Sequence, residues 1–273
     1  MRLDGTPVRK ETAMYYLAPH FMTHRYDAMN MTTVNVPEAP MRAYMNAKRK
    51  EGKPISHLAL ILTAYLRTAA EYPALNRFIV NKRAYQHNDF TVSMVVLRPG
   101  EDEDTMSKIY LDFHDTVFDV QDKITEYVTE NRKDNNGNAL DKAMNVILKL
   151  GPVLSIAMGA LRFMDRHGLM PRSLIKASPF HASLLISNLS SIRTNHIYHH
   201  VYEFGTTSVG ITMGNMREIP RRSRDGIVFD RCIPLGVVMD ERICSGHYFA
   251  QAFAQFKRYL ADPTLLETPY EGK

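Results

Sequence analysis

Cysteine is scarce in this chain: only Cys232 and Cys244 occur among 273 residues. Two thiols are too few for the disulfide framework on which small secreted domains depend, so we expect a reducing compartment and a cytoplasmic protein. A continuous basic face is also missing, because positive charge clusters only briefly, at 47–50 and 217–224, although the net charge is +5. This distribution favours anionic small molecules or weak surface attraction and argues against nucleic acid as a partner.

Signals for secretion or membrane insertion are not found in the sequence either. Residues 1–16 lack the apolar core of a signal peptide. The longest apolar run, 143–164, contains Lys149 and Arg162 and is interrupted by Gly-Pro at 151–152, so we expect no transmembrane segment. The run has two interpretations: a pair of short, largely buried helices, or an apolar wall for a long acyl chain or for weak contact with a membrane surface.

What remains is the composition of a globular protein with a sizeable core, at 45% hydrophobic and 23% charged residues. No linker rich in Pro, Gly or Ser divides the chain, so we expect a single domain over 1–273. Apolar spacing and stop signals predict helices and strands that mix along the chain, which indicates an α/β fold with a mixed sheet. The expected helices are 38–52, 55–72, 118–130 and 246–261, and the expected strands are 77–80, 83–87, 90–97, 183–189, 208–214 and 226–240.

The stretch DERICSGHYFAQAFAQF, residues 240–256, combines the end of a predicted strand, a tight turn containing Gly246 and the start of a helix. Such a junction projects side chains into a cleft, and the N-terminus of the helix is a favourable place for negative charge. We therefore expect a functional site at this junction.

Three segments resemble the catalytic domain of the dihydrolipoyl acyltransferases of the 2-oxoacid dehydrogenase complexes, which shares its fold with chloramphenicol acetyltransferase. They are YPALNRFIV with AYQHNDFTVSMVV (72–96), LLISNLSS (184–191) and IPLGVVMDERICSGHYFAQAFAQFKRYLADPTLLE (233–267). The resemblance implies a two-layer sandwich, with helices on one side of a mixed β-sheet. It also implies a homotrimer with its sites between subunits, and transfer of an acyl group from a coenzyme A thioester, with no covalently bound cofactor.

The last segment carries the family motif Asp-His-Arg, two variable residues and Asp-Gly, in altered form. Asp240, Arg242 and Gly246 match that motif, whereas Glu241 stands in place of the catalytic histidine and Ser245 in place of the aspartate. In the family, the histidine takes a proton from the attacking thiol or hydroxyl, and a serine hydroxyl stabilises the oxyanion. Ser187 matches that serine, so the resemblance implies that the oxyanion donor is kept while the base is changed.

Two residues are candidates for the missing base. Glu241 would need a raised pKa to remove a proton from a thiol, and the alternative is a structural carboxylate paired with a cation such as Arg242. His247 titrates near neutrality but stands six residues beyond the position of the family histidine, at the start of a helix. We expect His247 to be a helix-side or interface histidine more often than a base.

A metal site is not expected at the histidine cluster 195–200. Its members His196, His199 and His200 have no accompanying carboxylate or cysteine motif, and neighbours on a strand point to opposite faces. The chain also shows no lipoyl domain and no subunit-binding domain, so a swinging-arm substrate is not expected in cis. An NNG turn at 135–137 and the segment 139–170 depart from the family and leave room for a larger acyl group or a partner surface.

Two functional hypotheses therefore follow from the sequence. One is a coenzyme A-dependent acyltransferase that works through an altered site, with an acceptor that the residues do not identify. The alternative is a catalytically silent relative that keeps the trimer as a binding or scaffold protein. The environment of Glu241 distinguishes the two, because an open carboxylate can exchange a proton and one buried in a salt bridge cannot.

Overall fold

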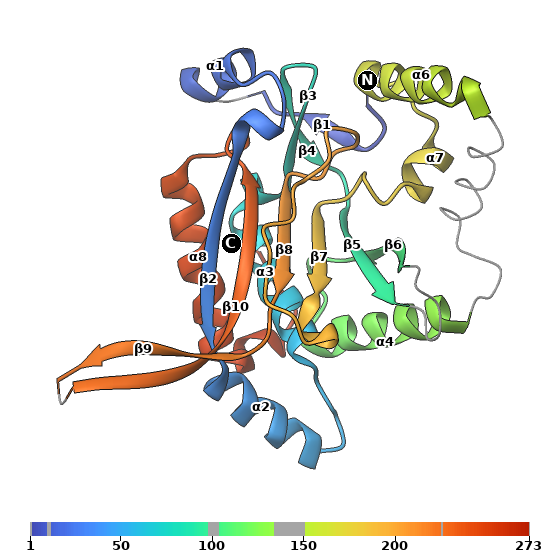
Figure 1. Cartoon of the computed structure of the whole chain (residues 1–273). Helices are drawn as coiled ribbons and strands as arrows, with labels where there is room; N and C mark the ends of the chain where they lie inside the picture. The colour runs from blue at the N-terminus through green and yellow to red at the C-terminus, as the bar shows by residue number, and fades with distance from the viewer. Residues whose placement is uncertain (1, 10–11, 98–103, 134–150, 225, 273) are drawn as a thin grey trace.

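A computed structural model describes residues 2–9, 12–97, 104–133, 151–224 and 226–272. Its main feature is a seven-stranded sheet with the order β2-β10-β8-β7-β5-β6, in which β9 also pairs with β10 (Figure 1). The strands are β2 (Met29–Pro37), β5 (Phe90–Leu97), β6 (Asp104–Leu111), β7 (Leu184–Asn188), β8 (Val209–Met213), β9 (Arg217–Ser223) and β10 (Gly226–Asp240). Strand β7 is parallel to β5 and β8, whereas β10 is antiparallel to β8, so the sheet is mixed as expected.

Helices cover one face of this sheet. The helices α3 (His57–Glu71) and α8 (Gly246–Ala261) pack against each other and against the inward side chains of the strands. Figure 1 shows them behind the sheet, with α2 (Glu38–Lys50) and α4 (Val117–Lys133) near its lower end. The predicted two-layer α/β fold with helices on one side is therefore confirmed.

A smaller three-stranded sheet, β1-β4-β3, lies beside the main one. Its strands are β1 (Gly5–Pro7), β3 (Arg77–Val80) and β4 (Arg83–His87). Asn81 and Lys82 join β3 to β4 with positive φ angles of 49° and 60°, the geometry of a two-residue hairpin turn. This hairpin confirms the one predicted from the sequence.

Periodicity also predicts α3 closely. Ser56 caps the helix by accepting a hydrogen bond from the backbone N–H of Ala59 at 3.1 Å, and Pro73 follows its last turn. Almost every residue of α3 is buried, which explains why its sequence is apolar nearly all round.

Three strands of the main sheet, β2, β6 and β9, were not expected from the sequence. Strand β2 follows the helix α1 (Ala13–Phe21) and pairs along the C-terminal half of β10, whereas β9 pairs with its N-terminal half. The β9–β10 hairpin projects away from the body as a two-stranded arm at the lower left of Figure 1. These strands carry few of the alternating apolar residues by which a half-buried strand is recognised, since most of their side chains are exposed or half-buried.

The described part of the apolar run at 143–164 is more exposed than the interpretation as buried helices predicts. Its first part, like the turn at 135–137, lies outside the described residues, and the rest forms most of α6 (Leu154–His167). Within α6 only Asp165 is buried, whereas Ile156 is 70% exposed. The prediction of largely buried helices is therefore wrong for α6, and no helix of the described ranges is long and apolar enough to cross a membrane.

The histidine segment 195–200 forms an irregular loop. It crosses the sheet on the face opposite the helices, so closely that a Cβ on Gly236 would lie 2.3 Å from the carbonyl oxygen of Ile197. A Cβ on Gly214 would lie 2.2 Å from the backbone nitrogen of His196. Glycine is required at both positions because the loop backbone occupies the side-chain space.

Candidate functional site

The C-terminal end of β10 is built on a buried ion cluster. Asp240 is fully buried and accepts two hydrogen bonds from the Arg242 guanidinium, at 2.8 Å from Nε and 2.7 Å from Nη2. Arg25, also buried, places its Nε 3.7 Å from Oδ2 of the same carboxylate. Burial opposes the charge of Arg242, but the hydrogen bonds and charge of Asp240 outweigh it and raise the pKa of Arg242.

Glu241 lies outside this cluster. Its backbone N–H donates to the carbonyl of Ala28 at 2.8 Å, which continues the pairing of β10 with the start of β2. Its half-buried side chain accepts one hydrogen bond, from the Asn30 amide to Oε2 at 2.5 Å. The considered pairing of Glu241 with Arg242 is wrong, because the bidentate contact with Asp240 engages that guanidinium. Among the described residues, Glu241 has no ion-pair partner.

The turn after Glu241 leads into α8, and each of its motif positions has a local role. Ser245 is the N-cap of the helix and accepts a hydrogen bond from the backbone N–H of Tyr248 at 3.1 Å. Gly246 is the first helical residue, at the position where the predicted helix 246–261 begins. His247 stands exposed in the first turn of α8, as expected for a helix-side histidine.

Ser187 lies near the C-terminal end of β7, 7% exposed. Side chains alternate along a strand, and its neighbours Leu184 and Ile186 enter the core beneath the helices. The Ser187 hydroxyl therefore points to the opposite face of the sheet, the one crossed by the histidine loop. No hydrogen bond joins this hydroxyl to any of the described residues, so it is available to a ligand.

One chain does not bring Ser187 and Glu241 together. Ser187 pairs with Thr212, Thr212 with Gly236, and Gly236 with Thr33, which places all four in one row across the sheet. Glu241 lies five residues beyond that row along β10, or roughly 16 Å at the rise of a strand. The two candidates therefore occupy opposite ends of the sheet.

A basic cavity adjoins the end of the sheet that carries Glu241. It has a volume of about 610 Å³ and is lined by the β3–β4 turn, by α6, by residues 202–205 and by Arg242. Lys82, Arg162 and Arg166 line it and have no ion-pair partner among the described residues. Asp165 and Glu203 also line the cavity, but Asp165 is paired with Arg2, so the three cations outnumber the one remaining carboxylate and favour an anion.

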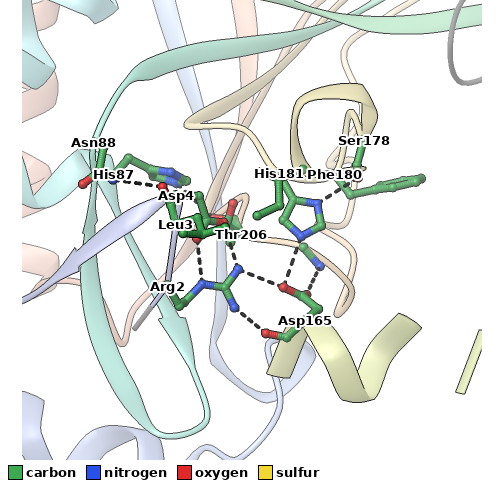
Figure 2. A network of polar contacts seen from close by, with 12 residues as sticks. Arg2, Leu3, Asp4, His87, Asn88, Asp165, Ser178, Phe180, His181 and Thr206 are labelled. Atoms are coloured by element: carbon green, nitrogen blue, oxygen red, sulfur yellow. Dashed lines mark hydrogen bonds and ion pairs between the residues drawn. The ribbon is translucent and has the colours of Figure 1, made fainter. Parts of the chain in front are cut away.

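The most connected polar network of the described residues was not predicted (Figure 2). Arg2 binds Asp165 of α6 at 2.8 Å and also holds Asp4, while His181 lies 3.2 Å from Asp165. Burial opposes ionisation of Asp165, but the contacts with His181 and Arg2 outweigh it and hold the pKa of that carboxyl well below its usual range. The participants are far apart in the sequence, so no local pattern could have identified the network.

The network contains a chain of Ser178, His181 and Asp165 that resembles a nucleophilic triad in connectivity. Ser178 Oγ lies 2.8 Å from His181 Nδ1, and His181 Nε2 faces Asp165. However, Ser178 lines none of the described cavities, and Arg2 and the backbone N–H of Gly205 occupy the carboxylate. The chain therefore ties α6 to the body of the molecule and does not form a reaction centre.

The histidine cluster does not gather around one point. His196 is held by Thr33, whose hydroxyl lies 3.0 Å from Nε2, whereas His199 and His200 contact each other as stacked rings. Within the part of the chain that the structure describes, no group of three or more His, Cys, Asp or Glu side chains could hold a metal ion.

No known family model and no curated protein sequence matches this chain. Solved structures do: the cubic core of the pyruvate dehydrogenase multienzyme complex is 14% identical with a TM-score of 0.62, over 95% of this chain and 94% of that chain. A probable dihydrolipoamide acetyltransferase from Listeria monocytogenes is 13% identical, with a TM-score of 0.59 over 93% of this chain and 94% of that chain. A chloramphenicol acetyltransferase is 12% identical, with a TM-score of 0.56 over 94% of this chain and 99% of that chain. At these identities the likeness establishes an acyltransferase-type fold, and the chemistry must be argued from the residues of this chain.

Proposed function

We propose that this protein is a coenzyme A-dependent acyltransferase whose site forms between chains of a homotrimer, with Glu241 as its proton acceptor. The observation that carries this proposal is that no ion pair or hydrogen-bond network of the described residues keeps the side chains of Glu241 and Ser187 from reacting. Glu241 accepts only one amide hydrogen bond, and the Ser187 hydroxyl has no partner among the described residues. Their positions at opposite ends of one sheet mean that a complete site needs a second chain.

The basic cavity at the end of the sheet that carries Glu241, lined by the neighbouring Arg242, supports coenzyme A as the substrate. Lys82, Arg162 and Arg166 are suited to the phosphates of such a molecule, since uncompensated cations raise the local concentration of an anion. In the proposed reaction, Glu241 removes the proton of the acceptor as it attacks the thioester, and Ser187 of another chain donates a hydrogen bond to the oxyanion. The proton then passes from Glu241 to the departing thiolate.

Release of free coenzyme A, detected with a thiol reagent, tests the proposal on a panel of acyl thioesters and acceptors. Short-chain thioesters with dihydrolipoamide are expected to react weakly, because a carboxylate is a poorer base toward a thiol than an imidazole. Within the best pair of substrates, Glu241→Gln and Ser187→Ala should each lower the rate about a hundredfold. Glu126→Gln, an exposed carboxylate on α4, is the matched control and should change nothing. An unchanged rate in Glu241→Gln would exclude the carboxylate as the base.

A silent relative that binds or assembles without catalysis is the second candidate. It is favoured by the charge of Glu241, because a carboxylate beside a developing oxyanion opposes the charge that acyl transfer creates. The same panel separates the two candidates. A protein that releases no coenzyme A from any thioester, and in which Glu241→Gln changes nothing, is the silent relative.

A further inference from the structure

A second cavity lies at the other end of the sheet, beside Ser187. It has a volume of about 390 Å³, and it opens where the parallel strands β7 and β8 end, at Asn188 and Met213. The start of α3 and the last turns of α2 form its opposite wall. Ligands of open α/β sheets bind beyond the carboxyl ends of parallel strands, and this volume is within the range of small-molecule sites.

The wall of this cavity is largely apolar and adaptable. Methionine side chains are flexible and polarizable, so they fit chains of different lengths better than branched residues do. The apolar lining residues are Met45, Ile55, Leu58, Met213, Met216 and Ile233.

One positive charge at the rim is uncompensated. Arg49 lines the cavity, is exposed, and has no ion-pair partner among the described residues. The nearby buried carboxylate of Glu38 is already occupied, by Arg42 at 3.3 Å and His57 at 3.9 Å. The charge of Arg49 is therefore left to a ligand, and the N-terminus of α3 at the same wall adds to the preference for an anion.

We propose that this cavity binds a medium-chain aliphatic carboxylate, with its alkyl chain against the methionine wall and its carboxylate on Arg49. Asn188 and Ser190, one and three residues after Ser187, line the same cavity, whereas the Ser187 hydroxyl itself points to the face of the sheet opposite α2 and α3. This binding is separate from the proposed acyl transfer, because the acyl group of a thioester has no free carboxylate to pair with Arg49.

Methyl-labelled methionine gives a direct readout of this binding in the full-length protein. The chain has 16 methionines, of which three line the cavity, and each signal can be assigned by a single Met→Leu substitution. Addition of octanoate should shift the NMR signals of Met45, Met213 and Met216 together and saturably, while those of the exposed Met14 and Met31 stay in place. Affinity should rise about fourfold for each methylene from butyrate to octanoate.

Charge variants test the carboxylate contact. Arg49→Gln should weaken octanoate binding at least fivefold and leave 1-octanol binding unchanged, whereas Lys50→Gln, the next residue of α2, should alter neither. Shifts at Met14 and Met31 alone, no saturable shift at millimolar octanoate, or an unchanged affinity in Arg49→Gln would each overturn the proposal.

The same measurement separates this inference from the proposed function. Octanoate binding needs neither coenzyme A nor Glu241, so Glu241→Gln should bind octanoate normally. Normal binding in a protein that transfers no acyl group contradicts the proposed function alone. Brisk transfer of octanoyl groups without the methionine shifts contradicts the cavity alone.

Discussion

At the C-terminal end of β10, Asp240 and Arg242 have a structural role, whereas Glu241 between them is the candidate for chemistry. Asp240 and Arg242 hold each other in the buried cluster, and Glu241 between them stays outside it. Glu241 and Arg242 belong to the turn after β10, in which the Arg242 side chain folds back onto Asp240 while that of Glu241 contacts Asn30 of β2. The buried Asp240–Arg242 pair thus fixes the backbone of this turn without a contact from the side chain at position 241.

Asp240→Asn should destabilise the protein severely. The change leaves the buried guanidinium groups of Arg25 and Arg242 without a negative partner, and breaking a buried ion pair costs about 3–5 kcal/mol. Chemical denaturation checks the free energy of unfolding. Asp230→Asn is the matched control on the same strand, since its pair with Arg221 is exposed to solvent, and its unfolding should be indistinguishable from that of the parent.

Glu241→His combined with Ser245→Asp should raise acyl transfer at least tenfold. The substitutions introduce the two residues that the resembled family motif has at these positions, and a positioned general base is worth about a hundred to ten thousandfold in rate. Stability should be retained, because aspartate caps a helix as well as the serine that now accepts from Tyr248. Release of coenzyme A and a thermal melt measure the two effects, and the idea fails if a folded double variant is no faster than the parent.

At the scale of elements, the network around Asp165 fastens α6 and the N-terminal segment to the body. Arg2 and Asp4 come from the start of the chain, His181 comes from the loop before β7, and Gly205 comes from the loop between β7 and β8. Few apolar side chains of α6 are buried, so these polar contacts supply much of its attachment.

As the pH falls, protonation of His87 should be the first event that lowers the stability of the fold around the Asp165 network. Burial lowers the pKa of His87 to about 3, although Asp4 acts in the opposite sense. Its unfolded value is near 6.5, so its contribution to stability is complete above about pH 6.5 and is lost as the pH falls toward 3. The loss at pH 4.5 amounts to about 2–3 kcal/mol.

Thermal melts at pH 7.5, 5.5 and 4.5 check this prediction. His87→Asn should flatten the fall between pH 6.5 and 4.5, whereas His24→Asn, an exposed histidine, should leave it unchanged. The lowered pKa of Asp4 acts in the same direction but at lower pH, because carboxylates protonate below about pH 4. An equally steep fall in His87→Asn would show that another group is responsible.

At the scale of the whole molecule, the β9–β10 arm points to an assembly. Ile227 and Phe229 are 70% and 64% exposed on one face of this two-stranded ribbon. A projecting hairpin with large apolar side chains is unfavourable in water and is stabilised when another chain covers it. The arm therefore fits the proposed trimer, in which each site takes residues from two chains.

If the proposed trimer forms, Ile227→Glu with Phe229→Glu should separate it into monomers. Light scattering at micromolar concentration measures the mass, and circular dichroism checks that the fold is kept. Leu174→Glu, an exposed leucine on α7 that is 41% exposed, serves as control and should remain a trimer. A parent protein that is itself monomeric at that concentration would contradict both the arm and the shared site.

Sequence patterns alone determined the elements whose hydrophobic period is strong. Helix α3 and the strands β5, β7, β8 and β10 follow from apolar spacing and stop signals, because burial on one or both faces dictates their composition. The junction at Glu241 and the position of Ser187 also followed from local motifs.

The relative positions and contacts of the candidate site residues depend on the tertiary structure and do not follow from the sequence patterns. The tertiary structure placed Glu241 and Ser187 at opposite ends of the sheet, engaged Arg242 with Asp240, and joined Arg2 to Asp165. It also created the two cavities, whose walls come from segments far apart in the chain. The physical reason is that charge pairing and cavity shape depend on contacts between distant residues, whereas periodicity records only which face of an element is buried.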